Sequence, residues 1–252
     1  MASSKSRALT RDIILSAALE LVDDAGLSAL SLRSLGKRLG VSQAAFYRHF
    51  PDKAALLEGI CEQLWRLTYE RFLALVQGAD GVHDDAAPGA SATAAVPAAS
   101  GASAVSAPDQ ALQAQEYIRQ YANCLRATLQ DHPNTVILLM THPISTPEQL
   151  SLLAGVLASL ARSGFTPTTE TLALITSVSV YTTGFVAAEV VPPAGTSDDA
   201  VVAGTEDLMA VSAMLDPADA AALQPLIGEV LAGKWDFSAQ FERGLEAILR
   251  GW

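Results

Sequence analysis

Apolar residues recur every three or four positions along most of this 252-residue chain, and no segment of strictly alternating apolar and polar residues competes with that pattern. The three- to four-residue period places side chains on one face of an α-helix, whereas alternation would indicate a β-strand. The first helix is predicted between Thr10, a residue type that caps helix N-termini, and Gly26, which ends it. Ser31 begins a second short helix that extends to Leu39. The pattern therefore predicts an all-α protein.

A turn and a third short helix follow at residues 40–50. Gly40 ends the second helix, and Ser42 can cap the next one, which we expect to extend to Phe50. Phe46 and Phe50 are four residues apart and so share one helix face, while small, polar and cationic side chains occupy the other. Three such helices predict a compact unit of roughly fifty residues that contains a helix-turn-helix. Its inward-facing residues are predicted to be Leu21, Leu30, Leu35, Leu39, Phe46 and Phe50.

The junction between this unit and the rest of the chain is predicted at residues 51–53. Pro51 stops the third helix, Asp52 can cap a fourth, and Lys53 then occupies the first turn of that helix. A cation at this position opposes the helix dipole. We therefore expect Lys53 to share an anion with the free backbone N–H groups there, and a DNA phosphate is the obvious candidate.

The remaining pattern predicts a helical body. A helix of roughly twenty-five residues begins at Lys53 and ends near Gln77. Residues 80–108 are rich in Ala, Gly, Ser and Pro, which is typical of a flexible insert, and residues 192–207 form an acidic loop. The chain thus divides into a domain at 1–55 and a larger bundle at 56–252. Further helices are predicted at 110–130, 135–141, 147–162, 168–191, 217–232 and 237–252. We expect the helices at 168–191 and 237–252 to form a four-helix dimer interface with their symmetry mates.

Charge is distributed unevenly along the chain. The formal net charge is −11, yet residues 1–55 hold eight basic and five acidic side chains, a net charge of +3. The other 197 residues hold eight basic and 22 acidic side chains, a net charge of −14. A basic end on an acidic body orients the molecule toward a polyanion and weakens nonspecific binding through the body. The polar arm at residues 1–8 could touch DNA or remain a solvated tail.

Several classes of function are disfavoured by what the sequence lacks. It has no apolar run of eighteen or more residues and no signal-type segment at residues 1–10, so we expect a soluble cytoplasmic protein without a membrane partner. Cys61 and Cys124 are isolated within helical patterns, so we expect neither a metal site nor a disulfide. The GxSxG, GxxxxGK[ST], HExxH and GxGxxG motifs are absent, so an enzyme is not expected. A helical enzyme that uses His132 and His142, and an interaction module that has lost DNA binding, remain as alternatives.

Three segments of the N-terminal unit are together similar to the DNA-binding signature of the tetracycline-repressor (TetR) family of transcription regulators. They are LRSLGKRLGVS at 32–42, FYRHF at 46–50 and KAAL at 53–56. Residues 129–143, 160–165 and 181–189 resemble, more weakly, the C-terminal domain of the tetracycline repressor. The resemblance implies an N-terminal three-helix helix-turn-helix domain and a C-terminal helical ligand-binding and dimerisation bundle. It also implies a homodimeric repressor that binds a palindromic double-stranded operator and is released by a small-molecule effector.

Transferred position by position, the resemblance implies a DNA-reading surface on the helix-turn-helix. The chemistry agrees, because glutamine can bond adenine through two hydrogen bonds and alanine methyl groups pack on the thymine methyl. Arg33 and Lys53 supply charge for phosphate, and Tyr47 has the alternative role of packing the small domain against the long helix. The implied DNA-binding residues are Arg33, Ser42, Gln43, Ala44, Ala45, Tyr47, Arg48, His49 and Lys53.

The effector site is where the chain departs from the tetracycline repressor. In that repressor a histidine of the interface helix helps to hold the metal carried by the drug, and the alignment places Val180 there. A second expected histidine falls at Leu138. Without these nitrogen ligands we expect no metal, no cofactor, and a largely apolar or aromatic effector. The candidate ligand-binding residues, each of which could instead be an ordinary core residue, are Trp65, Tyr69, Tyr117, Tyr121, Leu138, Thr141, His142, Tyr181 and Phe185.

Overall fold

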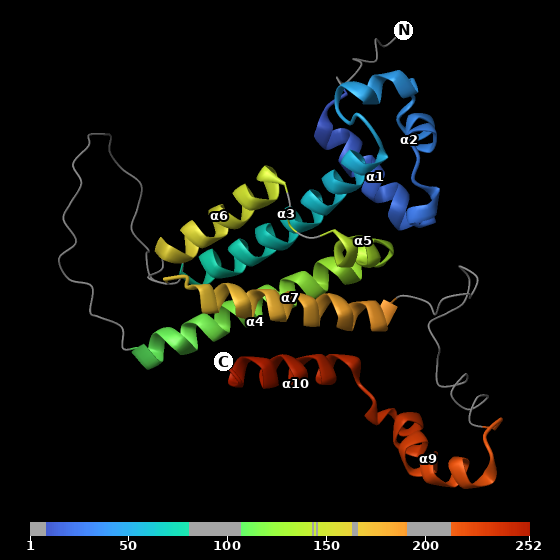
Figure 1. The fold of residues 1–252 in the computed structure, drawn as a ribbon, viewed down its shortest axis with the longest axis vertical. Helices are drawn as coiled ribbons and strands as arrows, with labels where there is room; N and C mark the ends of the chain where they lie inside the picture. Colours follow the sequence, from blue (N-terminus) through green and yellow to red (C-terminus); the bar gives the residue numbers. More distant parts are fainter. Residues whose placement is uncertain (1–8, 81–106, 143, 145, 163–165, 191–212) are drawn as a thin grey trace.

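The computed structural model describes residues 9–80, 107–142, 144, 146–162, 166–190 and 213–252, and every regular element within them is a helix. The N-terminal unit contains α1 (Arg11–Ala25), the short 3₁₀ helix η1 (Leu27–Ala29), α2 (Leu32–Leu39) and η2 (Gln43–Arg48), drawn in blue in Figure 1. The all-α prediction is confirmed.

The caps predicted for the first two helices are present. The Thr10 hydroxyl accepts a hydrogen bond from the Ile13 N–H at 3.3 Å, and Ser31 forms a reciprocal capping box with Ser34. Gly40 ends α2 with a φ of 67°, in the left-handed region that glycine enters without steric cost. Local signals therefore account for both boundaries of α2.

The third element differs from its prediction in kind and length. It is a six-residue 3₁₀ helix at Gln43–Arg48 that stops before Phe50, and the Ser42 side chain makes no capping hydrogen bond. The N–H groups of His49 and Phe50 both donate to the carbonyl oxygen of Phe46 at 2.8 Å, which closes the segment tightly. Phe46 and Phe50 are fully buried as predicted, because they are the apolar anchors of this segment.

A long helix, α3 (Lys53–Asp80), leaves the N-terminal unit and enters the body. Asp52 caps it as predicted, accepting from the Ala55 N–H at 2.8 Å. The body continues with α4 (Ala107–Asp131), η4 (Pro133–Thr135), α5 (Val136–Thr141) and α6 (Pro147–Arg162). It ends with α7 (Thr169–Val190), α9 (Pro217–Glu229), the π-helical turn η5 (Val230–Lys234) and α10 (Phe237–Arg250). Most of the predicted insert and all of the predicted acidic loop lie outside the described residues.

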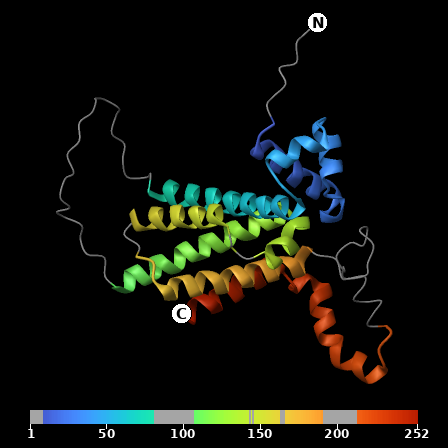
Figure 2. The same ribbon diagram turned by 45° about the horizontal axis from the view of Figure 1, so that its top comes forward.

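The body helices pack in sequence across the bundle: α6 lies against α3, α3 against α4, α4 against α7, and α7 against both α5 and α10 (Figures 1 and 2). In both views α9 extends away from the other body helices, and none of its described residues is buried. One large apolar cluster extends from α1 to α7, so the N-terminal unit and the body share a continuous core. A second cluster joins α10 to α4 and α7 through Ile118, Ala122, Leu174, Val178, Phe241, Leu245 and Leu249.

Helix α7 is the one described helix that is long and apolar enough to cross a membrane by length and composition, and 28% of its most apolar window is buried. A core or interface helix of a soluble protein has the same composition, and α7 packs against three other helices. Its outer face keeps apolar side chains in solvent, with Leu172 40% and Val180 69% exposed. Such a face is suited to a protein partner.

Candidate nucleic-acid interface and ligand cavity

The nine residues predicted to bind DNA lie on α2, on η2 and the two residues that flank it, Ser42 and His49, and at the start of α3. Seven of them are exposed, while Ala45 and His49 are half-buried. Tyr47 is 54% exposed, so about half of its surface remains available to a partner. The helix-turn-helix unit lies at one end of the molecule, beyond the body helices, where a duplex could approach it (Figure 1).

The exposed segment is held in place from behind by close packing. Phe46 and Phe50 have no exposed surface. Gly36 of α2 comes so close to the following turn that a Cβ atom there would lie 3.0 Å from the Val41 carbonyl oxygen and 3.5 Å from the Phe46 ring. A well-packed base of this kind fixes the direction of the side chains on the opposite face.

The cations of this surface differ in whether they are paired. Within the described residues, Arg33, Lys37, Arg48 and Lys53 are exposed and form no ion pair. Arg38, in contrast, donates to Asp24 at 2.8 Å and to Glu20 at 3.0 Å, and these hydrogen bonds raise its pKa above the ordinary value. The unpaired cations are therefore available to a phosphate backbone.

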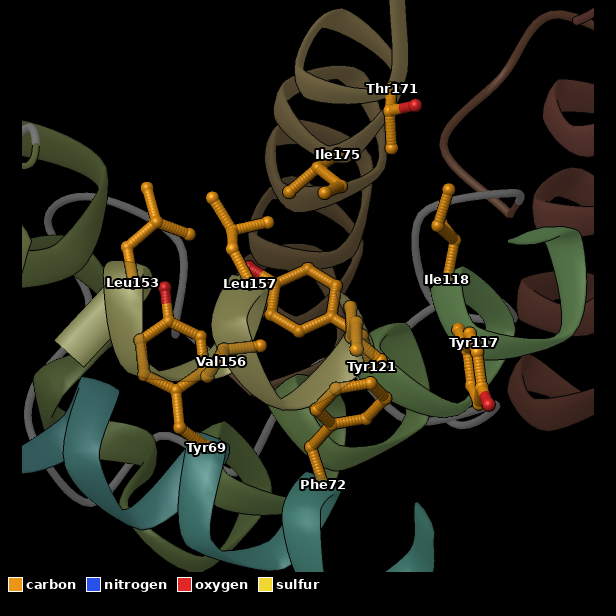
Figure 3. A pocket seen from close by; sticks show the side chains of 11 residues that line it. Tyr69, Phe72, Tyr117, Ile118, Tyr121, Leu153, Val156, Leu157, Thr171 and Ile175 are labelled. Carbon is orange, nitrogen blue, oxygen red and sulfur yellow. The ribbon is translucent and has the colours of Figure 1, made fainter. Parts of the chain in front are cut away.

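A cavity in the body is enclosed by α3, α4, α6 and α7 (Figure 3). Its free volume is about 30 Å³. A drug-sized ligand, which needs on the order of 300–1,000 Å³, fits only if the walls separate. The lining residues are Tyr69, Phe72, Tyr117, Ile118, Tyr121, Leu153, Val156, Leu157, Leu160, Thr171 and Ile175.

Aromatic rings dominate the inner wall of the cavity. The rings of Tyr69 and Tyr121 stack with centroids 6.3 Å apart, and Phe72 meets Tyr121 edge-on at the same distance. Burial raises the pKa of Tyr69 to about 12 and raises that of Tyr121 further, so both phenols stay neutral at physiological pH. The Tyr121 hydroxyl lies 2.8 Å from the Ser179 hydroxyl, which provides it with a hydrogen-bond partner.

Among the residues that the structure describes, no charged side chain lines the cavity. The described part of the chain also contains no group of three or more His, Cys, Asp or Glu side chains that could hold a metal ion. Transfer of an ion into such an apolar space is unfavourable. The walls therefore suit a neutral apolar or aromatic molecule.

Only some of the residues predicted to bind a ligand lie at the cavity. Tyr69, Tyr117 and Tyr121 line the cavity, and Trp65 stacks behind Tyr69 at 5.9 Å. Leu138, Thr141 and His142 belong to α5 and the residue after it and are not among the lining residues. The Thr141 hydroxyl donates to the carbonyl oxygen of residue 137, and the His142 imidazole lies 3.0 Å from that of Leu138, so both are engaged locally.

Tyr181 and Phe185 lie on the side of α7 that faces α10. Their rings are each 5.5 Å from the ring of Phe241, and the Tyr181 hydroxyl donates to the Phe241 carbonyl oxygen at 3.0 Å. In this structure they hold α10 in place and do not line the cavity.

The sequence pattern did not identify most of the aliphatic residues that line the cavity. The stripe on α6, which consists of Leu153, Val156, Leu157 and Leu160, has the ordinary spacing of a core-facing helix. Nothing in that spacing distinguishes a residue that borders free space from one that fills it. Leu153 and Leu157 are half-buried, which reflects the opening of the cavity.

Comparison with known proteins gives a consistent result along the chain. Residues 14–60 match the family of bacterial regulatory proteins described as the tetR family, and residues 107–252 match the tetracyclin repressor-like C-terminal domain. An HTH-type transcriptional regulator of Saccharopolyspora erythraea is 31% identical over 243 residues, which covers 96% of this chain and 84% of that protein.

Two further proteins are similar to this chain, one over about a quarter of its length and the other over nearly all of it. The class C tetracycline repressor of Escherichia coli is 41% identical over 61 residues, 24% of this chain and 28% of that protein. The crystal structure of the Streptomyces coelicolor TetR family protein ActR in complex with actinorhodin superposes with a TM-score of 0.61 at 19% identity, covering 97% of this chain and 95% of that one. At that identity the second match shows a shared fold.

Proposed function

Because this chain belongs to the TetR family of bacterial transcription regulators, we propose that it is a homodimeric repressor that leaves a palindromic operator when a small apolar or aromatic effector binds its body. Regulators of this family bind DNA through the helix-turn-helix, and no catalytic activity is proposed for the chain. Its place of action is the cytoplasm, where the operator is accessible.

The observation that carries the proposal is the set of exposed cations around η2 that are unpaired within the described residues. In the sequence, Arg33 and Lys53 lie on either side of the exposed Gln43 and Tyr47, and the rest of the chain after residue 55 carries a net charge of −14. Cations at the edges would contact phosphates and fix the register, while Gln43 and the neighbouring alanines would contact base edges in the major groove. The acidic body would be repelled by DNA and would keep this surface as the point of contact.

The dimer is proposed to form through α7 and α10. The outer face of α7 exposes Leu172 and Val180, and a Cβ atom added to Gly184 on the same face would meet no described atom within 4 Å. A twofold axis through this face would pair the two helices of each protomer with their symmetry mates. The two η2 segments would then need a separation of about 34–36 Å, one DNA turn, to reach successive half-sites.

The effector is proposed to enter beside α6, where the lining residues Leu153 and Leu157 are half-buried. Neutral phenols, aliphatic side chains and the lack of charge among the described lining residues support a neutral aromatic or apolar molecule. The structure of ActR holds actinorhodin, so this fold can accommodate a ligand. Since the free space is small in this structure, effector binding would favour a state in which the walls have separated, and differential affinity for the two states would release the DNA.

The test is selection of DNA by the purified full-length protein. Genomic fragments, including the region upstream of its own gene, are bound at moderate salt, sequenced and searched for an inverted repeat. The proposal expects recovery of a palindromic site and a dimer on that site by light scattering. Recovery of no enriched sequence would contradict it and favour an interaction module without DNA binding.

A further inference from the structure

Helix α6 provides four of the cavity's lining residues, and its N-terminus is anchored at Thr146. Thr146 and Gln149 form a capping box: the Gln149 N–H donates to the Thr146 hydroxyl, and the Thr146 N–H donates to the Gln149 side chain, both at 3.2 Å. The Thr146 hydroxyl also donates to Oε1 of Glu62 on α3 at 3.1 Å. The cavity wall is therefore attached to a carboxylate of the neighbouring helix.

The other oxygen of Glu62 connects to the DNA-binding unit. Its Oε2 accepts a hydrogen bond from Arg11 Nη2 at 2.7 Å, and Arg11 is the first residue of α1. The Glu62 side chain is only 5% exposed, so it has little access to water that could replace a lost partner. A buried carboxylate depends on its hydrogen bonds and on its counter-charge.

Arg11 in turn lies over the anchor of the DNA-reading segment. Its guanidinium carbon is 4.6 Å from the centroid of the Phe50 ring. Gly59, one turn before Glu62 on α3, allows this close contact: a Cβ atom there would lie 2.7 Å from Leu15, 3.0 Å from Phe50 and 3.4 Å from Arg11 Nη2. Phe50 is fully buried, so the packing leaves its ring little room to move independently of these neighbours.

We propose that Glu62 is the positioning residue through which the cavity wall controls the orientation of α1 and η2. This inference rests on the proposed function, because it assigns the route by which occupancy of the cavity reaches the DNA-reading surface. The free space is too small for a drug-sized ligand, so a ligand must push the walls apart. Helix α4 packs extensively on both α3 and α7, whereas α6 packs mainly on α3, so opening of the cavity displaces α6 from α3. Displacement of α6 carries Thr146 away from Glu62 and removes a hydrogen-bond partner of the carboxylate.

The consequence follows from the burial of Glu62. A buried carboxylate oxygen without a partner is unfavourable, so the side chain adopts a new position where both oxygens are bonded. Arg11 follows its counter-charge, and Phe50 follows Arg11 because the two are in contact. The DNA-reading unit therefore has one orientation with Thr146 engaged and another without it.

The experiment is a double-mutant cycle measured as affinity for the DNA site selected by the wild type. Leu157→Trp overfills the cavity and pushes α6 outward without requiring an effector, and Leu157→Phe is a smaller version in case the first variant does not fold. In the wild-type background we expect Leu157→Trp to weaken DNA binding about tenfold or more, whereas in the Glu62→Gln background it should change binding by less than about twofold. Thr146→Val removes the hydroxyl that binds Glu62, so it should also reduce the effect of Leu157→Trp on DNA affinity. Thr146→Ser keeps the hydroxyl and should not reduce that effect.

Asp216→Ala is the matched control for loss of a helix cap. Asp216 caps α9 through the N–H groups of Ala218 and Asp219, and α9 does not border the cavity, so DNA affinity should be unchanged. The rate of backbone hydrogen exchange in α1 provides a second readout. Leu157→Trp should raise this rate when Glu62 is present and should leave it unchanged in the Glu62→Gln background. An equal effect of Leu157→Trp in both backgrounds, or no effect in either, would overturn the coupling role of Glu62. Failure of the wild type to select any DNA would instead contradict the proposed function itself.

Discussion

The Nδ1 atom of His132 lies 2.9 Å from Oδ2 of Asp23, and this contact ties the residue after α4 to the last turns of α1. A carboxylate can only accept, so Nδ1 carries the proton. Asn134 adds a hydrogen bond from its side-chain amide to the Val22 carbonyl oxygen at 3.0 Å. Helix α1 is therefore attached to the body at both ends, through Arg11 at its start and through Asp23 near its end.

The first prediction concerns this second attachment. His132→Ala leaves the Asp23 carboxylate, whose other oxygen is already buried without a partner in the described structure, with no hydrogen bond from the body. We expect the free energy of unfolding to fall by about 1–3 kcal/mol. The double variant Asp23→Ala/His132→Ala should be less destabilised than the single variant, because no uncompensated carboxylate remains. Urea denaturation of both variants measures the difference, and equal losses would contradict this interpretation of the pair.

The second prediction compares two helical glycines. A Cβ atom on Gly244 of α10 would overlap the Tyr181 hydroxyl and lie 2.7 Å from the ring carbon that bears it, whereas one on Gly155 of α6 would meet no described atom within 4 Å. Gly244→Ala should destabilise the protein by about 1–3 kcal/mol through overpacking of α10 against α7. Gly155→Ala should stabilise it by about 0.5–1 kcal/mol, because alanine favours the helix. Thermal unfolding monitored by circular dichroism distinguishes the two, and shifts of the same sign would count against the close approach of α10 to Tyr181.

The third prediction is a pH dependence that arises from Tyr69. Burial raises its pKa to about 12 in the folded protein, against about 10 in the unfolded chain. Between those values the unfolded state loses the proton first, so the free energy of unfolding falls as the pH rises from about 10 to about 12. The loss from this residue is about 1.4 kcal/mol per pH unit.

Tyr69→Phe is the matched variant for this prediction, since it keeps the ring that stacks on Trp65 and Tyr121. Its stability should decline less steeply with pH than that of the wild type, by a difference that grows above pH 10 toward about 1.4 kcal/mol per unit. Urea titrations at pH values of about 9, 10 and 11, which span the onset of phenol ionisation, measure both slopes. Parallel slopes would mean that the Tyr69 phenol ionises as easily in the folded protein as in the unfolded chain.

The helices could be predicted closely because their boundaries depend on local chemistry. Pro147 opens α6 and the helix ends at residue 162, as the sequence predicts, and Asp52 caps α3 in the same way. Such signals act through neighbouring residues and are visible in the sequence. The 3₁₀ geometry of η2 is not visible there, because it depends on how Phe46 and Phe50 fit the core of the N-terminal unit.

The cavity could be predicted only in part, because α7 is apolar on most sides. Thr171 and Ile175 face the cavity, whereas Tyr181 lies six residues beyond Ile175, which turns it by about 240° around the helix toward α10. From the sequence alone, an aromatic residue of α7 that faces the cavity looks the same as one that faces α10. Which side faces free space is decided by the neighbouring helices. The role of Glu62 depends likewise on partners 51 and 84 residues away along the chain.

The fourth prediction concerns the central claim that the unpaired cations of the N-terminal unit bind DNA. Lys53→Glu and Arg33→Glu remove cations that form no ion pair in the described structure. Lys234→Glu makes the same change in net charge on η5, where the lysine is paired with Glu229 at 3.0 Å. This control therefore distinguishes the loss of a direct contact with DNA from the effect of a changed net charge.

The most direct measurement is the dissociation constant of the selected DNA fragment, determined by fluorescence anisotropy over a range of salt concentrations. We expect Lys53→Glu and Arg33→Glu each to weaken binding by about tenfold or more and to reduce the slope of log K against log salt by about one. Lys234→Glu should stay within about twofold of the wild type. If the first two variants bind as the wild type does, with an unchanged salt slope, this surface does not contact DNA and the proposed function is wrong.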